Sequence, residues 1–116
     1  MSRRTDRLGE LFREEISALL TKGLKDPRVG FVTISRVEVT EDLSYAKVLV
    51  SVMGDDKEKT STLIALRNSA GFIRAHLGKA VKIRKMPELQ FALDASLEHA
   101  MTIQRILHEL KDQGQL

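Results

Sequence analysis

The sequence predicts one α+β domain built in the order helix, two strands, two helices that meet at a kink, a third strand and a last helix. Two periodicities support this fold class. Apolar residues recur every three or four positions near both ends of the chain, whereas apolar and polar residues alternate over 32–53 and 88–93. No linker, repeat or low-complexity segment divides the 116 residues, so we expect a single domain spanning 1–116.

The first helix is predicted over residues 5–24, where apolar positions form one stripe. It should end ahead of Pro27, because proline restricts the preceding residue and donates no backbone hydrogen bond. Arg3, Arg4 and Arg7 lie at its start, where the helix dipole disfavours cations, so we do not expect them to serve helix stability. The stripe consists of Leu8, Leu11, Phe12, Ile16, Leu19, Leu20 and Leu24.

An antiparallel hairpin is predicted next, from residues 32–40 and 45–53 joined by a polar turn. The alternation in the first strand slips once at Ser35 and Arg36, which predicts a β-bulge. One face of the second strand should point into the core, and it consists of Ala46, Val48, Val50 and Val52.

Residues 57–80 have a helical composition but do not fit one straight helix. Phe72 lies nine residues after Leu63, so at about 100° per residue an unbroken helix would point the two side chains to opposite sides. A kink between them would let both face the core; the alternative is a single helix that leaves Phe72 exposed. The predicted kink residues are Ser69, Ala70 and Gly71.

A third strand is predicted over 88–93, with Pro87 at its start, and it should join the hairpin in a three-stranded mixed sheet. Asp94 or Ser96 can cap a last helix, and residues 113–116 should form a frayed tail. The apolar stripe of that helix consists of Ala100, Ile103, Leu107 and Leu110. Because the apolar stripes are just enough to cover one such sheet, we expect a monomer.

Positive charge is concentrated in one part of the chain. The net charge is only +3, yet residues 59–87 carry seven basic residues and no acidic one. Basic residues without interleaved acid are the footprint expected for a polyanion partner, bound through its phosphates. The alternative is that these cations only solvate the surface. They are Lys59, Arg67, Arg74, Lys79, Lys82, Arg84 and Lys85.

The sequence offers no residue set for catalysis. It has no cysteine, and its three histidines include no pair at metal-ligand spacing. Phosphate-loop, dinucleotide and hydrolase motifs are absent, and no apolar run reaches the ~18 residues of a membrane span. We therefore expect no enzyme activity, no metal, no cofactor and a cytoplasmic location. The aromatic side chains fit core positions better than a base-stacking platform, and they are Phe12, Phe31, Tyr45, Phe72 and Phe91.

The order of elements, with a basic segment around the kink, resembles a type II KH-like domain in which the residues at 69–71 (SAG) replace the usual G-x-x-G loop. Together with 71–74 (GFIR), 84–94 (RKMPELQFALD), 26–30 (DPRVG) and 37–40 (VEVT), this is similar to the bacterial ribosome-binding factor A family. In that family's kink motif, Ala-x-Gly, the first position is alanine, and here it is Ser69.

The resemblance implies a non-catalytic assembly factor that binds the small ribosomal subunit and its rRNA late in maturation. It further implies support of rRNA 5′-end processing, importance in the cold, and assembly GTPases among the partners. We expect the kink to turn the basic side chains onto one face that recognises folded RNA. The expected RNA-binding residues are Arg3, Arg4, Arg7, Arg67, Arg74, Lys79, Lys82, Arg84 and Lys85. The competing interpretation is a protein-interaction module whose first and last helices dock a partner.

Overall fold

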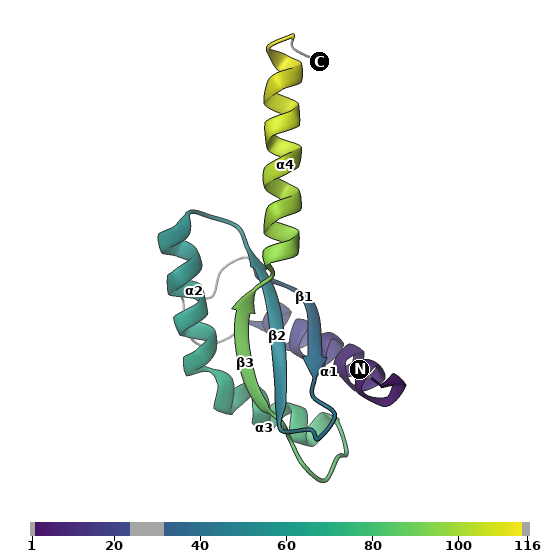
Figure 1. Cartoon of the computed structure of the whole chain (residues 1–116). Helices are drawn as coiled ribbons and strands as arrows, with labels where there is room; N and C mark the ends of the chain where they lie inside the picture. The colour runs from purple at the N-terminus through teal and green to yellow at the C-terminus, as the bar shows by residue number, and fades with distance from the viewer. Residues whose placement is uncertain (1, 24–31, 115–116) are drawn as a thin grey trace.

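The structure, a computed structural model, describes residues 2–23 and 32–114 and confirms the predicted order of elements (Figure 1). The elements are α1 (Arg3–Lys22), β1 (Val32–Val39), β2 (Tyr45–Val52), α2 (Asp56–Asn68), α3 (Ala70–Ala80), β3 (Glu88–Leu93) and α4 (Ala95–Asp112). The predicted stop at Pro27, the core position of Phe31 and the last two residues of the predicted tail lie outside the described residues.

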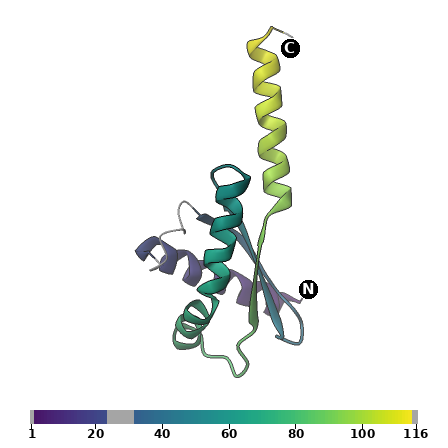
Figure 2. The same cartoon turned by 90° about the vertical axis from the view of Figure 1, so that its left-hand side faces the viewer.

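The three strands form one mixed sheet in the order β1-β2-β3, as predicted. β1 and β2 are antiparallel, and β2 and β3 are parallel. The register of the first pair shifts between Ile34 and Arg36, which confirms the predicted bulge. α1, α2 and α3 cover one face of the sheet, and no helix of the described residues lies against the other face (Figures 1 and 2).

The hydrophobic core lies between the sheet and these three helices. Phe12 and Ile16 of α1, Leu66 of α2 and Ile73 and Leu77 of α3 are all fully buried. The predicted inward face of β2 is confirmed, since its four side chains are at most 5% exposed. The apolar stripe of α1 therefore fixes this helix against the sheet, and its N-terminal end is held with it.

α1 approaches β1 at Gly9 more closely than any side chain would allow. A Cβ built at Gly9 would lie 2.3 Å from the carbonyl oxygen of Val37, well inside van der Waals contact. The obstacle is backbone, which cannot rotate away as a flexible side chain would. Glycine at this position therefore sets the distance between the helix and the sheet.

We expect Gly9→Ala to lower the free energy of unfolding by about 1–3 kcal/mol, because the added methyl must push α1 away from β1. Urea denaturation followed by circular dichroism measures the change. Gly78→Ala is the matched control, since a Cβ there meets nothing within 4 Å. Equal stability of the Gly9 variant and the unmodified protein would show that α1 is free to shift.

The predicted kink is present, but it does not bury Phe72. Ser69 stands between the two helices as the C-cap of α2 and the N-cap of α3. Its N–H donates to the carbonyls of Ala65 and Leu66. Phe72 is 59% exposed, so its predicted core position is wrong. At about 100° per residue, Phe72 cannot share the buried face of α3 with Ile73 and Leu77, even after the kink.

α4 projects away from the sheet instead of covering it (Figures 1 and 2). Ile103, Ile106 and Leu107 are 43–48% exposed, so the apolar stripe of this helix is not part of the core. A monomer is expected if the apolar stripes of the helices all cover the sheet, and the stripe of α4 does not. The monomeric state therefore stays a prediction. Asp94 caps the helix: its carboxylate accepts from the Ser96 N–H at 3.1 Å and from the Ser35 hydroxyl at 2.7 Å.

Candidate RNA-binding surface

A groove of about 350 Å³ lies between the first turns of α1 and the segment that follows α3. Three cationic side chains, Arg4, Arg7 and Lys82, line it together with aliphatic ones. The fold thus joins Arg4 and Arg7 to Lys82 of the acid-free segment, which follows them by more than seventy residues in the sequence. The aliphatic and small side chains of the groove are Leu8, Leu11, Ala80, Val81 and Ile83.

The start of α1 is ordered by its own cap. The Ser2 hydroxyl accepts from the Thr5 N–H at 3.2 Å, and Thr5 is almost fully buried. Arg4 and Arg7 are exposed, and within residues 2–23 and 32–114 neither forms an ion pair. The helix dipole disfavours cations at this end, so Arg4 and Arg7 do not stabilise α1. Because they also lack an ion-pair partner among the described residues, their charge is available to an anion from outside the chain.

The loop after α3 is tied to the turn between β1 and β2. The Lys85 ammonium donates to the Ser44 hydroxyl at 3.2 Å and to the Asp42 carbonyl at 3.4 Å. The Ser44 N–H and the Thr40 hydroxyl donate to the Asp42 carboxylate, which lowers the pKa of that group below its ordinary value. Lys85 therefore fixes one side of the loop in place, and Arg84 beside it is exposed.

Two of the expected RNA-binding arginines are engaged in holding the fold together. Arg74 on α3 donates from Nε to the Pro87 carbonyl at 3.0 Å and from Nη2 to the Met86 carbonyl at 2.7 Å. Arg67 on α2 donates to the Phe91 carbonyl at 3.3 Å. These bonds attach the kinked helices to the start and the free edge of β3, so both arginines are positioned by the protein's own backbone.

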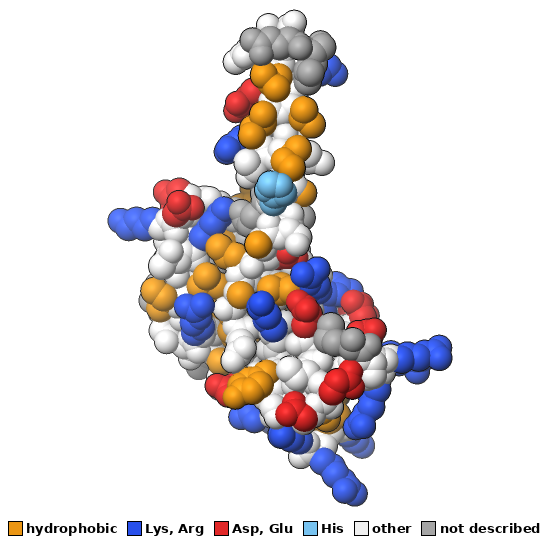
Figure 3. Space-filling model, in the orientation of Figure 1, with side chains coloured by type: hydrophobic (Ala, Val, Ile, Leu, Met, Phe, Trp, Pro, Cys, Tyr) orange, Lys and Arg blue, Asp and Glu red, His pale blue; other side chains and the backbone are white. Residues whose placement is uncertain are grey.

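The nine expected residues consequently do not form one patch of free cations. The structure gathers Arg4, Arg7 and Lys82 in the groove. Arg3, Lys79 and Arg84 are exposed and lie within three residues of a groove residue in the sequence, but they do not line the groove. Lys and Arg side chains project from the lower and right-hand margins of the molecule, where the start of α1 and the loop before β3 lie (Figure 3). The helix-free face of the sheet carries both signs of charge (Figure 3).

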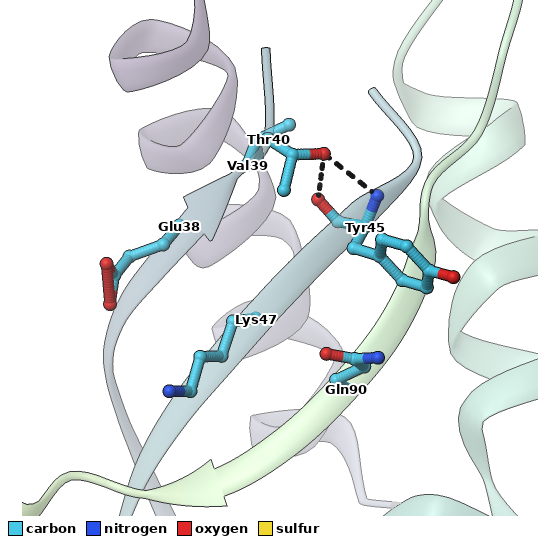
Figure 4. Close-up of a pocket in the computed structure, with 6 residues that line it drawn as sticks. All are labelled: Glu38, Val39, Thr40, Tyr45, Lys47 and Gln90. Atoms are coloured by element: carbon cyan, nitrogen blue, oxygen red, sulfur yellow. Dashed lines mark hydrogen bonds between the residues drawn. The ribbon is translucent and has the colours of Figure 1, made fainter. Parts of the chain in front are cut away.

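A second hollow, of about 330 Å³, lies on that helix-free face (Figure 4). Tyr45 and Lys47 of β2 line it with Gln90 of β3 and residues at the end of β1. Tyr45 is 44% exposed, so its predicted core position is wrong. Among the described residues that line it, Glu38 is the one carboxylate, and its Oε1 lies 3.4 Å from Nε of Arg36.

The described part of the chain contains no cluster of three or more histidine, cysteine, aspartate or glutamate side chains able to hold a metal ion. No helix within it is long and apolar enough to cross a membrane.

Sequence reasoning missed two features of the surface. Leu8 and Leu11 of the groove belong to the predicted stripe of the first helix, and nothing in the sequence shows that Leu11, at the edge of this stripe, stays 39% exposed. The exposure of Phe72 was weighed only as the consequence of an unbroken helix, whereas it occurs with the kink present.

Comparison with known proteins gives a consistent result. The chain matches the family described as Ribosome-binding factor A over residues 4–107. A Desulforamulus reducens protein of that name is 49% identical over 113 residues, which cover 97% of this chain and 94% of that protein.

Solved structures of similar proteins share the fold. Ribosome-binding factor A from Thermus thermophilus superposes with a TM-score of 0.68 at 24% identity, covering 77% of this chain and 94% of that one. A homology-derived structure of the Thermus thermophilus protein, fitted into a cryo-EM map of a 30S–RbfA complex, has a TM-score of 0.57 at 27% identity. That match covers 80% of this chain and 93% of the other.

Proposed function

The chain belongs to the ribosome-binding factor A family and has a KH-like fold, and from this we propose that it is a non-catalytic assembly factor that binds the small ribosomal subunit through its rRNA. The observation that carries the proposal is the groove in which Arg4, Arg7 and Lys82 meet, with no acidic side chain among the described residues that line it. Three cations on a preformed surface suit the phosphates of a folded RNA strand.

The proposed mechanism is differential binding. The groove, the exposed end of α3 and the anchored loop present cations at fixed positions, so the RNA arrangement that places phosphates opposite them is bound most tightly. A ligand that prefers one of two conformations shifts the population toward it without hydrolysis or a cofactor. The protein would hold one rRNA arrangement in this way while the subunit matures.

The finer role follows the family resemblance. We propose that the protein acts late in small-subunit maturation in the cytoplasm, as a monomer, and supports processing of the rRNA 5′ end. Its importance should increase in the cold, because misfolded RNA arrangements escape more slowly at low temperature. Assembly GTPases are the proposed partners for its release.

A second candidate function is favoured by one observation, the exposed apolar stripe of α4. Ile103, Ile106 and Leu107 are about half exposed, although helices in proteins gain most of their stability by packing their apolar face against another element. This helix suits a protein-interaction module, in which the basic groove would contribute only solubility.

Co-sedimentation with purified small subunits over a salt series distinguishes the two functions. Phosphate contacts predict that the logarithm of affinity falls linearly with the logarithm of salt, with a slope of about −2 to −3 for three contacts. The protein should pellet with free small subunits and not with intact ribosomes. Binding that hardly changes with salt would instead identify docking through apolar surface and refute recognition of phosphates.

A further inference from the structure

The outward face of α3 carries an aromatic side chain that the protein's own packing does not use. Phe72 is 59% exposed, although phenylalanine is among the residues most often buried. The buried face of the helix is centred between Ile73 and Leu77, which are both fully buried. Exposure of a large ring costs hydration free energy, so a partner that covers Phe72 would recover it.

The surroundings of Phe72 favour an anionic partner. At about 100° per residue, Lys79 lies almost directly in line with Phe72 two turns along the helix, about 10 Å away along the axis. Both side chains are exposed, and α3 contains no acidic residue. The chain around it, residues 59–87, also lacks aspartate and glutamate, and Glu15 of α1, which does reach α3, lies 3.3 Å from His76 Nε2 and is paired with that ring. Binding to a protein does not require positive charge without acidic residues, whereas binding to the phosphates of a nucleic acid strand favours it.

The remainder of the outward face is bare. Ala75 stands at its centre, and Gly71 and Gly78 lie on the side opposite to Phe72 and Lys79. A Cβ at either glycine would meet nothing within 4 Å, and neither glycine has a positive φ. Packing and backbone conformation therefore do not require glycine at these positions. Gly78 lies inside the helix, where glycine is less favourable than alanine.

We propose that the outward face of α3 binds an unpaired RNA nucleotide, with Phe72 stacked on the base and Lys79 contacting the backbone phosphate. The inference rests on the proposed function and adds to it a contact with a base, whereas the groove contacts only phosphates. Aromatic stacking accepts any base, so Phe72 requires that the RNA be unpaired at this point and does not select its sequence. The bare surface at Gly78 lets the strand lie close to the helix.

The first test measures affinity for purified small subunits. Phe72→Ala should weaken binding by roughly 5- to 150-fold, the range of one lost base stack, and by the same factor at every salt concentration. Phe72→Trp should retain the affinity. Lys79→Ala should instead reduce the salt slope by about one. Ile64→Ala, which removes another exposed apolar side chain, is the matched control and should leave binding unchanged.

The second test separates a binding role of Gly78 from a structural one. Gly78→Ala should raise the midpoint of thermal unfolding by a few degrees, because alanine favours the helix, and should weaken binding to the subunit. Unchanged or tighter binding of this variant would contradict close approach of the strand to the helix.

Photocrosslinking identifies the partner. A benzoylphenylalanine introduced at position 72 should crosslink to an unpaired nucleotide of the rRNA in bound small subunits. A crosslink to a ribosomal protein, or undiminished binding of Phe72→Ala, would overturn the proposal while the function itself stands. Failure of the unmodified protein to bind the subunit would refute the proposed function, and a stacking role with it.

Discussion

The combined variant Arg4→Glu, Arg7→Glu and Lys82→Glu is expected to bind small ribosomal subunits roughly 100- to 500-fold more weakly than the unmodified protein at about 0.1 M salt. These are the cations among the described residues that line the groove, and three lost phosphate contacts account for a decrease of this size. The slope of affinity against salt should become shallower by about 2–3. Fluorescence anisotropy with labelled protein measures both quantities.

The fold of this variant should remain intact. Arg4→Glu places an acidic residue in the first turn of α1, where the helix dipole favours it, and Arg7 and Lys82 are exposed, so the three substitutions should preserve the stability. Lys22→Glu, Lys57→Glu and Lys111→Glu together provide a control with the same change in net charge at exposed sites outside the groove, at the far end of α1, on α2 and on α4. Equal losses of affinity in the two triple variants would mean that total charge, and not the groove, governs binding.

Phe12→Ala is expected to lower the free energy of unfolding by about 3–5 kcal/mol. The ring is fully buried where α1 packs against the sheet, and its removal leaves a cavity that the backbone contact at Gly9 prevents from closing. Because α1 also carries Arg4 and Arg7, loosening this helix should disperse the groove as well. Urea denaturation gives the loss of stability, and binding below the unfolding temperature gives the loss of function.

Leu107→Ala serves as the control for this experiment. Leu107 is 48% exposed on α4, so its truncation should change the stability by less than about 1 kcal/mol. A loss as large as that of the Phe12 variant would show that α4 packs against the domain in solution.

The order of the elements could be predicted because each one has its own periodicity. The alternation slip at Ser35 and Arg36 even located the bulge, since one extra residue in a strand moves every later side chain to the opposite face. The kink lies at the predicted place, Ser69, but the argument for it is wrong, because Phe72, which a kink was expected to turn into the core, is 59% exposed.

The sequence does not show whether another element packs against the apolar face of a helix or strand. Periodicity shows that α4 has an apolar side, but only the direction in which the chain leaves β3 decides whether this side meets the sheet. Tyr45 illustrates the same limit: its strand alternates regularly, yet the face that carries Tyr45 has no helix against it. Both outcomes depend on contacts between distant segments, which a local pattern does not contain.

The sequence predicts that the protein has a basic surface, but it does not show which residues form that surface. The acid-free segment contains Arg67 and Arg74, yet carbonyl groups of β3 and its approach accept hydrogen bonds from both. Arg4 and Arg7 join Lys82 only because α1 crosses the sheet beside the end of α3. Charge along the chain thus indicated the kind of partner, whereas the contact residues followed from the packing of α1.

α4 extends away from the sheet from its junction with β3, so a small change of direction at this junction moves the far end of the helix a long way. With 18 residues at a rise of 1.5 Å each, α4 is about 27 Å long. A rotation of roughly 10° about Asp94 would therefore sweep its far end through about 5 Å, close to one helical turn. The hydrogen bond from the bulged Ser35 to Asp94 sits at the pivot. Together with the bond from the Asp94 N–H to the Val50 carbonyl, this contact lets β1 and β2 fix the direction in which the distant end of α4 points.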